Sequence, residues 1–207
     1  PLIDGAIKLA DHKPDFTVIL QREQHTCDLG PNGVDWHDFQ NGITPADCVM
    51  VGGSHPAYIL YTSGTTGAPK GVVRPTAGHL VALNWTMKNI YNVDPGDVFW
   101  AASDVGWVVG HSYICYAPLV HGNTTVVFEG KPVGTPDAGT FWRVISEHNV
   151  RSFFTAPTAI RAVKREDPKG EFAKKYDLSC LRALYLAGER ADPDTIEWAQ
   201  DILQKPV

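Results

Sequence analysis

The 207-residue sequence is 43% hydrophobic and 20% charged, and its formal net charge at pH 7 is −5. These proportions are close to the average of globular proteins and exclude a disordered chain. The acidic balance excludes a basic surface for nucleic acid or a polybasic membrane patch, and no run of about 18 apolar residues could span a membrane. Four scattered cysteines without a CxxC pair argue against a zinc site or a disulfide scaffold. Composition carries no signal for the oligomeric state.

The first 57 residues are predicted to form a helix, a strand and long loops. Apolar residues fall on one side of a helix over residues 2–10, and Phe16–Leu20 predicts a short buried strand. Glycine and proline are frequent over 21–56, so this stretch is predicted to be mostly loop, with one short helix near Trp36. We interpret residues 1–57 as a partial lead-in to a larger domain. The absence of an initiating methionine indicates a fragment without its targeting region.

From Tyr58 to Val207, short apolar runs alternate with longer amphipathic segments. Strands are predicted at 58–61, 71–74, 98–102, 124–128, 152–155 and 183–187. Helices are predicted at 76–91, 106–120 (entered through a loop), 138–148, 157–166 and 193–204. This alternation indicates an α/β fold with layered sheets and parallel crossovers. Four tryptophans are assigned to packing on these elements: Trp85, Trp100, Trp142 and Trp198.

Polar residues follow three of the predicted strands, at 62–71, 155–158 and 187–190. In open α/β sheets, ligands bind at the carboxyl ends of the strands. We therefore expect these three segments to converge on the candidate functional site.

The segment 61–71, YTSGTTGAPKG, follows a strand that is predicted to be buried. Its hydroxyl groups and glycine N–H groups suit phosphate oxygens, and Lys70 adds a positive charge. It is not a Walker A loop, because Pro69 precedes the lysine and Gly71 follows it, where GxxxxGK[ST] requires Gly and then Ser or Thr. We favour phosphate binding, and an ordinary surface loop is the alternative.

The same segment and three later ones resemble the motifs of the adenylate-forming (AMP-binding) superfamily. SDVGWVVGHSY (103–113) resembles the acyl-pocket motif of the short-chain acyl-CoA synthetases, and TAPTAIR (155–161) and AGER (187–190) resemble their later motifs. FEGKP (128–132) and the alanine of AGER are most similar to propionyl-CoA synthetases. The resemblance implies a partial N-terminal domain of an adenylate-forming enzyme, with the ATP- and acyl-binding core in residues 58–207.

The resemblance also implies a two-step reaction that uses ATP, Mg²⁺ and coenzyme A. A short-chain carboxylate forms an acyl-adenylate and pyrophosphate, and the thiol then displaces AMP. Such phosphoryl chemistry needs positioning and charge neutralisation but no protein nucleophile, which fits the absence of a GxSxG elbow. The residues implied to hold the β- and γ-phosphates are Thr62, Ser63, Gly64, Thr65, Thr66 and Gly67. Lys70 and Thr62 are the implied catalytic residues, and Thr65 is implied to lie near the metal ion.

Later residues match the family's nucleotide and coenzyme A contacts. Gly188, Glu189 and Arg190 match a nucleotide-contacting segment, in which the position of Arg190 is more commonly proline. Ala156 matches a position beside the coenzyme A arm. Without the resemblance, we would interpret Glu189 and Arg190 as a solvated pair before a helix capped by Asp192.

Trp107, Val108, Val109 and Ala187 match the positions that shape the acyl pocket. Acetate-specific relatives usually carry Thr in place of Val109 and Val in place of Ala187. Val109 removes a hydroxyl and Ala187 opens space, so both differences favour propionate, although one methylene is worth only ~1–3 kcal/mol. Periodicity alone would place Trp107 and both valines in the core. His111 is expected to line the pocket and is given no acid–base role.

The family's adenosine-clamping residues and C-terminal domain have no counterpart in these 207 residues. We therefore expect the chain alone to have no measurable synthetase activity and the full-length protein to carry it. An acetyl- or butyryl-CoA synthetase and a non-catalytic nucleotide-binding remnant are the alternatives. The resemblance implies a mitochondrial matrix location for a eukaryotic source and a cytoplasmic one for a bacterial source.

Overall fold

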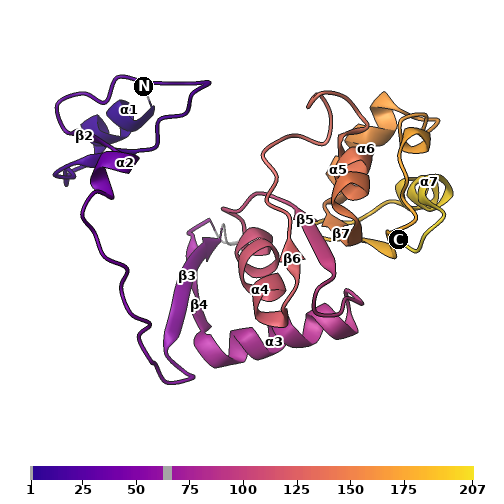
Figure 1. Ribbon diagram of the computed structural model, residues 1–207, viewed down its shortest axis with the longest axis horizontal. Helices are drawn as coiled ribbons and strands as arrows, with labels where there is room; N and C mark the ends of the chain where they lie inside the picture. Colours follow the sequence, from indigo (N-terminus) through magenta and orange to yellow (C-terminus); the bar gives the residue numbers. More distant parts are fainter. Residues whose placement is uncertain (1, 63–66) are drawn as a thin grey trace. The chain divides into compact units, whose positions relative to one another are not determined.

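A computed structural model describes residues 2–62 and 67–207. The contacts within the chain divide it into two compact units, Pro1–Met50 and Val51–Val207. Figure 1 labels the helices and strands of these units.

The first unit holds two short helices and two short strands. Its elements are α1 (Leu2–Leu9), β1 (Thr17–Ile19), β2 (Gly33–Asp35) and α2 (Trp36–Phe39). β1 and β2 pair in parallel, with Thr17 opposite Gly33. The predicted helices are confirmed, whereas the predicted burial of the strand at 16–20 is wrong, because none of the described residues 2–50 is buried. The pattern also did not indicate β2, which is too short for a periodicity to develop.

The second unit begins with an antiparallel hairpin made of β3 (Pro56–Thr62) and β4 (Lys70–Pro75). Both strands were predicted, but the expectation of a buried strand before the glycine-rich segment is wrong: Ile59 is 56% exposed and Tyr61 is 70% exposed. The hairpin is also separate from the parallel sheet. The segment 62–71 therefore joins two antiparallel strands and does not follow a strand of that sheet.

A four-stranded parallel sheet forms the centre of the second unit (Figure 1). Its order is β6-β5-β7-β8, with β5 at Val98–Ala102, β6 at Thr124–Thr125, β7 at Val150–Thr155 and β8 at Ala183–Leu186. This confirms the predicted α/β fold with parallel crossovers. The strand predicted at 124–128 is shorter than expected: Thr124 and Thr125 are in register with β5, and the N–H of Val126 donates to the Phe99 carbonyl at 3.2 Å.

Helices connect and cover these strands. They are α3 (Thr76–Asn89), the π-helix η1 (Gly110–Tyr116), α4 (Ala117–His121), α5 (Thr140–His148), α6 (Pro157–Glu166), the 3₁₀ turn η2 (Ala173–Lys175) and α7 (Pro193–Leu203). The helix predicted within 106–120 is a π-helix that continues into a short α-helix. Its first residue is glycine for a steric reason: a Cβ at Gly110 would lie 2.2 Å from the carbonyl oxygen of Asp104. α3 begins directly after β4 and packs against α4 (Figure 1).

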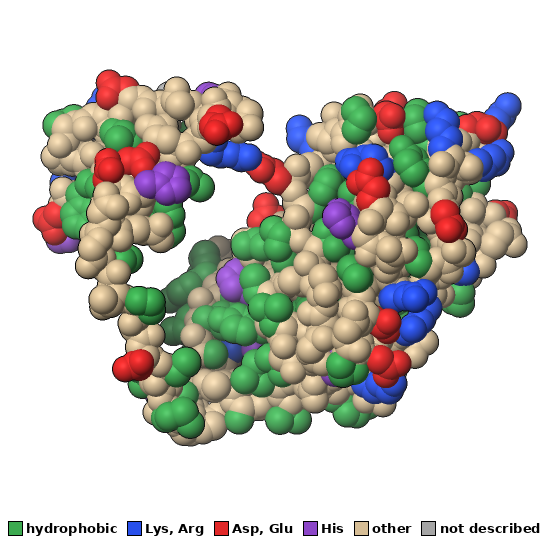
Figure 2. All heavy atoms as spheres, in the orientation of Figure 1, with side chains coloured by type: hydrophobic (Ala, Val, Ile, Leu, Met, Phe, Trp, Pro, Cys, Tyr) green, Lys and Arg blue, Asp and Glu red, His purple; other side chains and the backbone are tan. Residues whose placement is uncertain are grey.

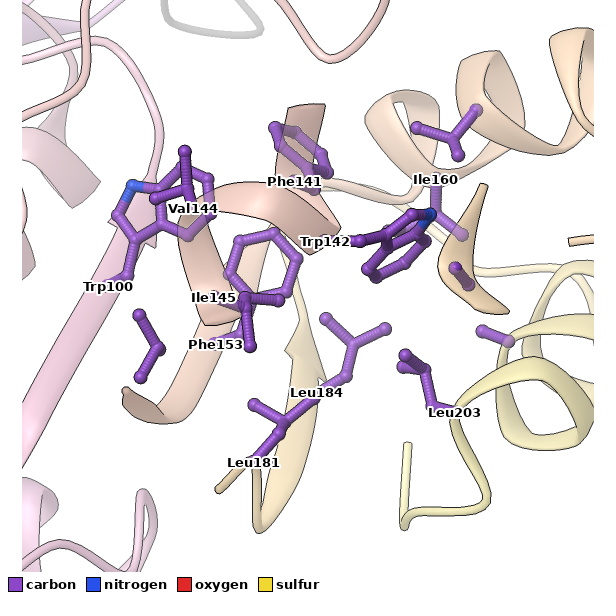
Figure 3. Close-up of a cluster of buried hydrophobic side chains, with 14 of the residues drawn as sticks. Trp100, Phe141, Trp142, Val144, Ile145, Phe153, Ile160, Leu181, Leu184 and Leu203 are labelled. Carbon is purple, nitrogen blue, oxygen red and sulfur yellow. The ribbon is translucent and has the colours of Figure 1, made fainter. Parts of the chain in front are cut away.

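The two faces of the sheet carry two hydrophobic cores. Because side chains alternate along a strand, Trp100 and Phe153 enter one core while Phe99 and Phe154 enter the other. The first core includes residues of α5, α6 and α7, and Figure 3 shows Trp100, Phe153 and Leu184 of the sheet in one cluster with Trp142 of α5 and Ile160 of α6. The second core packs against α3, η1 and α4. The sheet is thus the middle layer between two groups of helices.

Many hydrophobic side chains remain at the molecular surface (Figure 2). Trp100 and Trp142 are fully buried, as expected of packing residues. The corresponding prediction for Trp85 is wrong, because this side chain is 58% exposed on α3. Helical spacing places a residue on a face, but it does not say whether another element covers that face.

Candidate active site

A cavity of about 450 Å³ lies at the carboxyl ends of β5, β7 and β8. Three segments line it: Ser103 and residues 107–109 after β5, residues 154–156 with Thr158 at the end of β7, and residues 187–189 after β8. This is the edge of a parallel sheet at which ligands bind. Two of the three polar segments that were expected to converge therefore meet here.

The predicted acyl-pocket residues lie together in the wall of this cavity. Trp107, Val108 and Val109 follow β5, and Ala187 reaches the same cavity from the end of β8. Trp107 is 69% exposed, so it does not belong to the core that periodicity alone would suggest. Val109 is partly buried against the core on the α3 side of the sheet. The wall is therefore anchored at Val109 and open to solvent at Trp107.

The turn that carries Trp107 is held by hydrogen bonds at both ends. The Asp104 carboxylate accepts a hydrogen bond from the N–H of Gly106 at 2.6 Å, and the Asp104 carbonyl accepts from the N–H of Trp107 at 3.1 Å. The His111 N–H and ring Nδ1 both reach the carbonyl oxygen of Trp107, at 3.1 and 2.9 Å. His111 does not line the cavity, contrary to expectation. It instead fixes the backbone of the cavity wall from behind.

The end of β7 presents Ala156 to the cavity. Thr155 is buried and its hydroxyl donates to the Ala102 carbonyl at 3.0 Å, which joins the ends of β7 and β5. Ala156 is exposed and extended (φ −89°, ψ 147°), and Pro157 starts α6 at the position where a helix tolerates proline. Because proline has no N–H, the first backbone N–H of α6 is that of Thr158.

The turn after β8 brings Gly188 and Glu189 to the cavity. The backbone of Gly188 has φ +96°, a conformation that residues other than glycine rarely adopt. A Cβ at this position would meet open space, so the backbone angle and not crowding favours glycine here. The carboxylate of Glu189 accepts hydrogen bonds from the N–H of Thr158 at 2.7 Å, from the Thr158 hydroxyl, and from Arg161 at 2.8 Å. Arg190 is exposed and does not line the cavity.

These hydrogen bonds change the ionisation of Glu189. The Thr158 hydroxyl has the largest effect, and the Thr158 N–H and Arg161 add to it, so the pKa of the Glu189 carboxyl lies below its usual value. The interpretation of Glu189 and Arg190 as a simple solvated pair does not hold, because Glu189 is bonded to α6. Our sequence reasoning assigned no role to Thr158 or Arg161. The available signal was Pro157, which marks a helix start and places the N–H of residue 158 at a helix end.

The glycine-rich segment is described only at its edges. Thr62 and Lys70 face each other as a pair in the β3–β4 register, and both are exposed. Gly67 is exposed with φ +86°. None of these three lines the 450 Å³ cavity. Ser63, Gly64, Thr65 and Thr66 lie outside the described residues, so the predicted phosphate contacts of these four and the metal role of Thr65 remain predictions.

Within 2–62 and 67–207, no group of three or more His, Cys, Asp or Glu side chains is placed to hold a metal ion. The four cysteines are free, with Cys27, Cys48 and Cys115 exposed and Cys180 half-buried. No helix in the described part of the chain is both long enough and apolar enough to cross a membrane.

Comparison with known families identifies the domain that contains this cavity. The sequence model of the family described as AMP-binding enzyme matches residues 5–207. The chain belongs to the AMP-binding enzyme family. The resemblance seen in the four motifs is thereby confirmed, and the AMP-binding domain covers both structural units.

Several curated relatives share this AMP-binding domain. The chain is 54% identical over 209 aligned residues to human acyl-CoA synthetase short-chain family member 3, mitochondrial. This alignment covers 100% of the chain and 30% of the human protein. It is 47% identical over 216 residues to acyl-CoA synthetase short-chain family member B, mitochondrial, of Dictyostelium discoideum, with 100% and 31% covered. It is 42% identical over 188 residues to acetyl-coenzyme A synthetase of Laribacter hongkongensis, with 90% and 28% covered. The chain thus spans less than a third of the length of these relatives.

Proposed function

We propose that the whole protein containing this chain converts a short-chain carboxylate, preferably propionate, to acyl-AMP and then to acyl-CoA. In the first step a carboxylate oxygen bonds to the α-phosphorus of ATP and pyrophosphate leaves. In the second step the thiol sulfur of coenzyme A bonds to the acyl carbon and AMP leaves. The names of the relatives and the family support an acid–thiol ligase.

The observation that carries this proposal is the cavity at the strand ends. It gathers Trp107, Val109 and Ala187 beside Ala156 and Gly188, so one space can hold a small acyl group next to the proposed coenzyme A arm and nucleotide. Reactants held side by side in this way react faster than free ones, because their encounter is already arranged. The cavity wall contributes apolar contacts to the acyl group, and Gly188 leaves its backbone accessible.

The hairpin has a separate proposed role. Lys70 would neutralise negative charge on the departing pyrophosphate, and Thr62 would donate its hydroxyl to the same group, with Ser63, Gly64, Thr65, Thr66 and Gly67 around the phosphates. Mg²⁺ would supply further charge neutralisation when bound, near Thr65. Both Lys70 and Thr62 are exposed at the loop end of the hairpin, where a nucleotide can reach them.

The preference for propionate is the finer part of the proposal. Ala187 takes less space than valine, and Val109 offers no hydroxyl, so the shared cavity wall favours one more carbon than acetate. The acetyl-coenzyme A synthetase of Laribacter hongkongensis makes acetate the rival substrate. We also propose a mitochondrial matrix location for a eukaryotic source and a cytoplasmic location for a bacterial one; the human and Dictyostelium relatives, which are named as mitochondrial, support the first of these.

The test uses the whole protein with ATP, coenzyme A and acetate, propionate or butyrate in parallel. We expect acyl-CoA formation with the highest kcat/KM for propionate, and Lys70→Met to lower kcat on the order of a hundredfold. Lys88→Met is the matched control, because Lys88 lies on α3 in an exposed ion pair with Asp94. Absence of acyl-CoA and of ATP–pyrophosphate exchange with all three acids would refute the proposed activity. We expect the 207-residue chain alone to give no pyrophosphate release above background.

A further inference from the structure

The turn at 187–190 is tied to the start of α6 through one carboxylate. Glu189 Oε1 accepts from the backbone N–H of Thr158, which has no partner inside its own helix because it belongs to the first turn. The same oxygen accepts from the Thr158 hydroxyl. Glu189 therefore caps a helix that is distant from it in sequence, and this fixes the residue next to Gly188.

Arg161 completes this arrangement from the next turn of α6. Its Nη2 donates to Glu189 Oε1 at 2.8 Å and to the Thr158 hydroxyl oxygen at 3.1 Å. Its Nη1 donates to Asp192 Oδ2 at 3.2 Å. Because the guanidinium is planar and carries several donors in fixed directions, one side chain holds two carboxylates at a set separation.

Asp192 is itself part of the start of α7. Its carboxylate accepts from the N–H and the hydroxyl of Thr195, both at 2.9 Å, as the cap of that helix. Arg161 thus joins the two ends of the segment 189–192 to α6. Gly188, Glu189, Arg190 and Ala191 lie between β8 and this anchored cap.

We propose that Arg161 is a positioning residue for the 187–190 turn: it holds Glu189 against the start of α6 and Asp192 at the start of α7. In the whole enzyme it sets the position of the Gly188 backbone at the cavity, an effect on catalysis that rests on the proposed function. Glu189 then acts by holding the turn, since its Oε1 is already bonded to α6. Arg161 does not itself line the cavity.

Position 164 on the same helix provides a matched control. Lys164 lies one turn further along α6 and also bridges to α7, with Nζ donating to the Asp194 carbonyl at 3.0 Å and paired with the Asp194 carboxylate. It joins the same two helices, and its hydrogen bond and ion pair go to Asp194 rather than to the 187–190 turn. Loss of Lys164 therefore reports a general weakening of the α6–α7 contact.

The test compares R161M, R161K and K164M with the wild type in the whole protein, using hydrogen–deuterium exchange with residue-level fragmentation. The reporting amides are those of Thr158, which donates to Glu189, and Ala187, which donates to the Thr155 carbonyl at 3.3 Å. We expect R161M to speed the exchange of both amides about three- to tenfold, because the variant loses a partly exposed charged contact. For R161K we expect exchange rates between those of R161M and the wild type. We expect K164M to leave both unchanged.

Unchanged exchange in R161M, or an equal increase in K164M, would overturn the proposal. If R161M does not fold, R161K decides: faster exchange at both amides supports the proposal, and wild-type exchange overturns it. Exchange requires no turnover, so a whole protein that activates no carboxylate would refute the proposed function and leave this test intact. If the enzyme is active, we also expect R161M to raise KM for ATP about fivefold more than KM for propionate, whereas K164M should not separate the two.

Discussion

The ring of Tyr58 stacks on the imidazole of His111, with 5.3 Å between ring centroids and 25° between ring planes. Tyr58 lies on β3, which leads into the glycine-rich segment, and His111 lies on η1 directly behind the cavity wall. Tyr58 also stacks on Tyr116 at 5.6 Å, and its hydroxyl lies 3.1 Å from Nε2 of His79. This cluster joins the hairpin to α3, which carries His79, and to η1, which carries His111 and Tyr116.

Replacing Tyr58 should loosen the hairpin in two separable steps. Tyr58→Phe keeps the stacked ring and loses the contact with His79, so we expect the free energy of unfolding to fall by about 1 kcal/mol. Tyr58→Leu also loses the stacking, and we expect a total of roughly 2 kcal/mol. Urea unfolding measures both. If the two variants are equally stable, the stacked rings do not stabilise the fold.

His79 should make stability depend on pH. Burial, and then the positive charge of Arg74, lowers the pKa of His79 below its usual 6.5. The folded state therefore favours neutral His79, while the unfolded state binds the proton more readily. This contribution is fully present above pH 6.5 and is lost as the pH falls below 6.5 through the lower folded pKa.

His79→Gln should remove that part of the pH dependence, as measured by thermal unfolding between about pH 5 and pH 8. His148→Gln is the matched control, because His148 is exposed at the end of α5. A wild-type slope in His79→Gln would show that other groups cause the pH dependence.

The pair Val109→Thr and Ala187→Val should move the whole enzyme toward acetate. Both side chains line the same cavity, one after β5 and one after β8, so the double change narrows it and adds a hydroxyl. We expect the ratio of kcat/KM for acetate to that for propionate to rise roughly 10- to 200-fold, the range for one methylene in an apolar pocket. Val127→Thr, at a residue that is 75% exposed, is the control. An unchanged ratio would remove these two residues from the specificity pocket.

Phe153 should be among the most costly residues to truncate. It is fully buried, and its ring stacks on Trp100 at 4.8 Å and meets Phe141 edge to face at 5.1 Å. We expect Phe153→Ala to lower the free energy of unfolding by about 3–5 kcal/mol, because it leaves a cavity between sheet and helices. Leu119→Ala, at a residue that is 65% exposed, should cost no more than about 0.5 kcal/mol. A similar shift of the urea midpoint in both variants would contradict this assignment of the core.

Local pattern was sufficient for most elements of the second unit. The continuous apolar run Val98–Ala102 predicted β5 with its observed bounds, and the amphipathic stretch that starts at Pro157 predicted α6. These signals are local, because the side-chain period and the helix-start residues are set by neighbours in the chain. The order of the four motifs indicated the AMP-binding family for the same reason: each motif can be recognised without its partners.

Local sequence pattern could not predict which strands pair or which side chains meet at the candidate site. The sequence of β3 has the apolar content of a buried strand, yet among the described residues it pairs with β4 alone and stays largely exposed, because burial depends on which element packs over it. Nothing local distinguishes Glu189 as the cap of α6 from Glu189 as a solvated side chain, since Thr158 and Arg161 lie about thirty residues earlier. Periodicity and motif order thus account for the elements and the family. The meeting of Val109 with Ala187, and of Glu189 with Arg161, follows from how the parallel strands pack side by side, which brings their carboxyl ends to one edge.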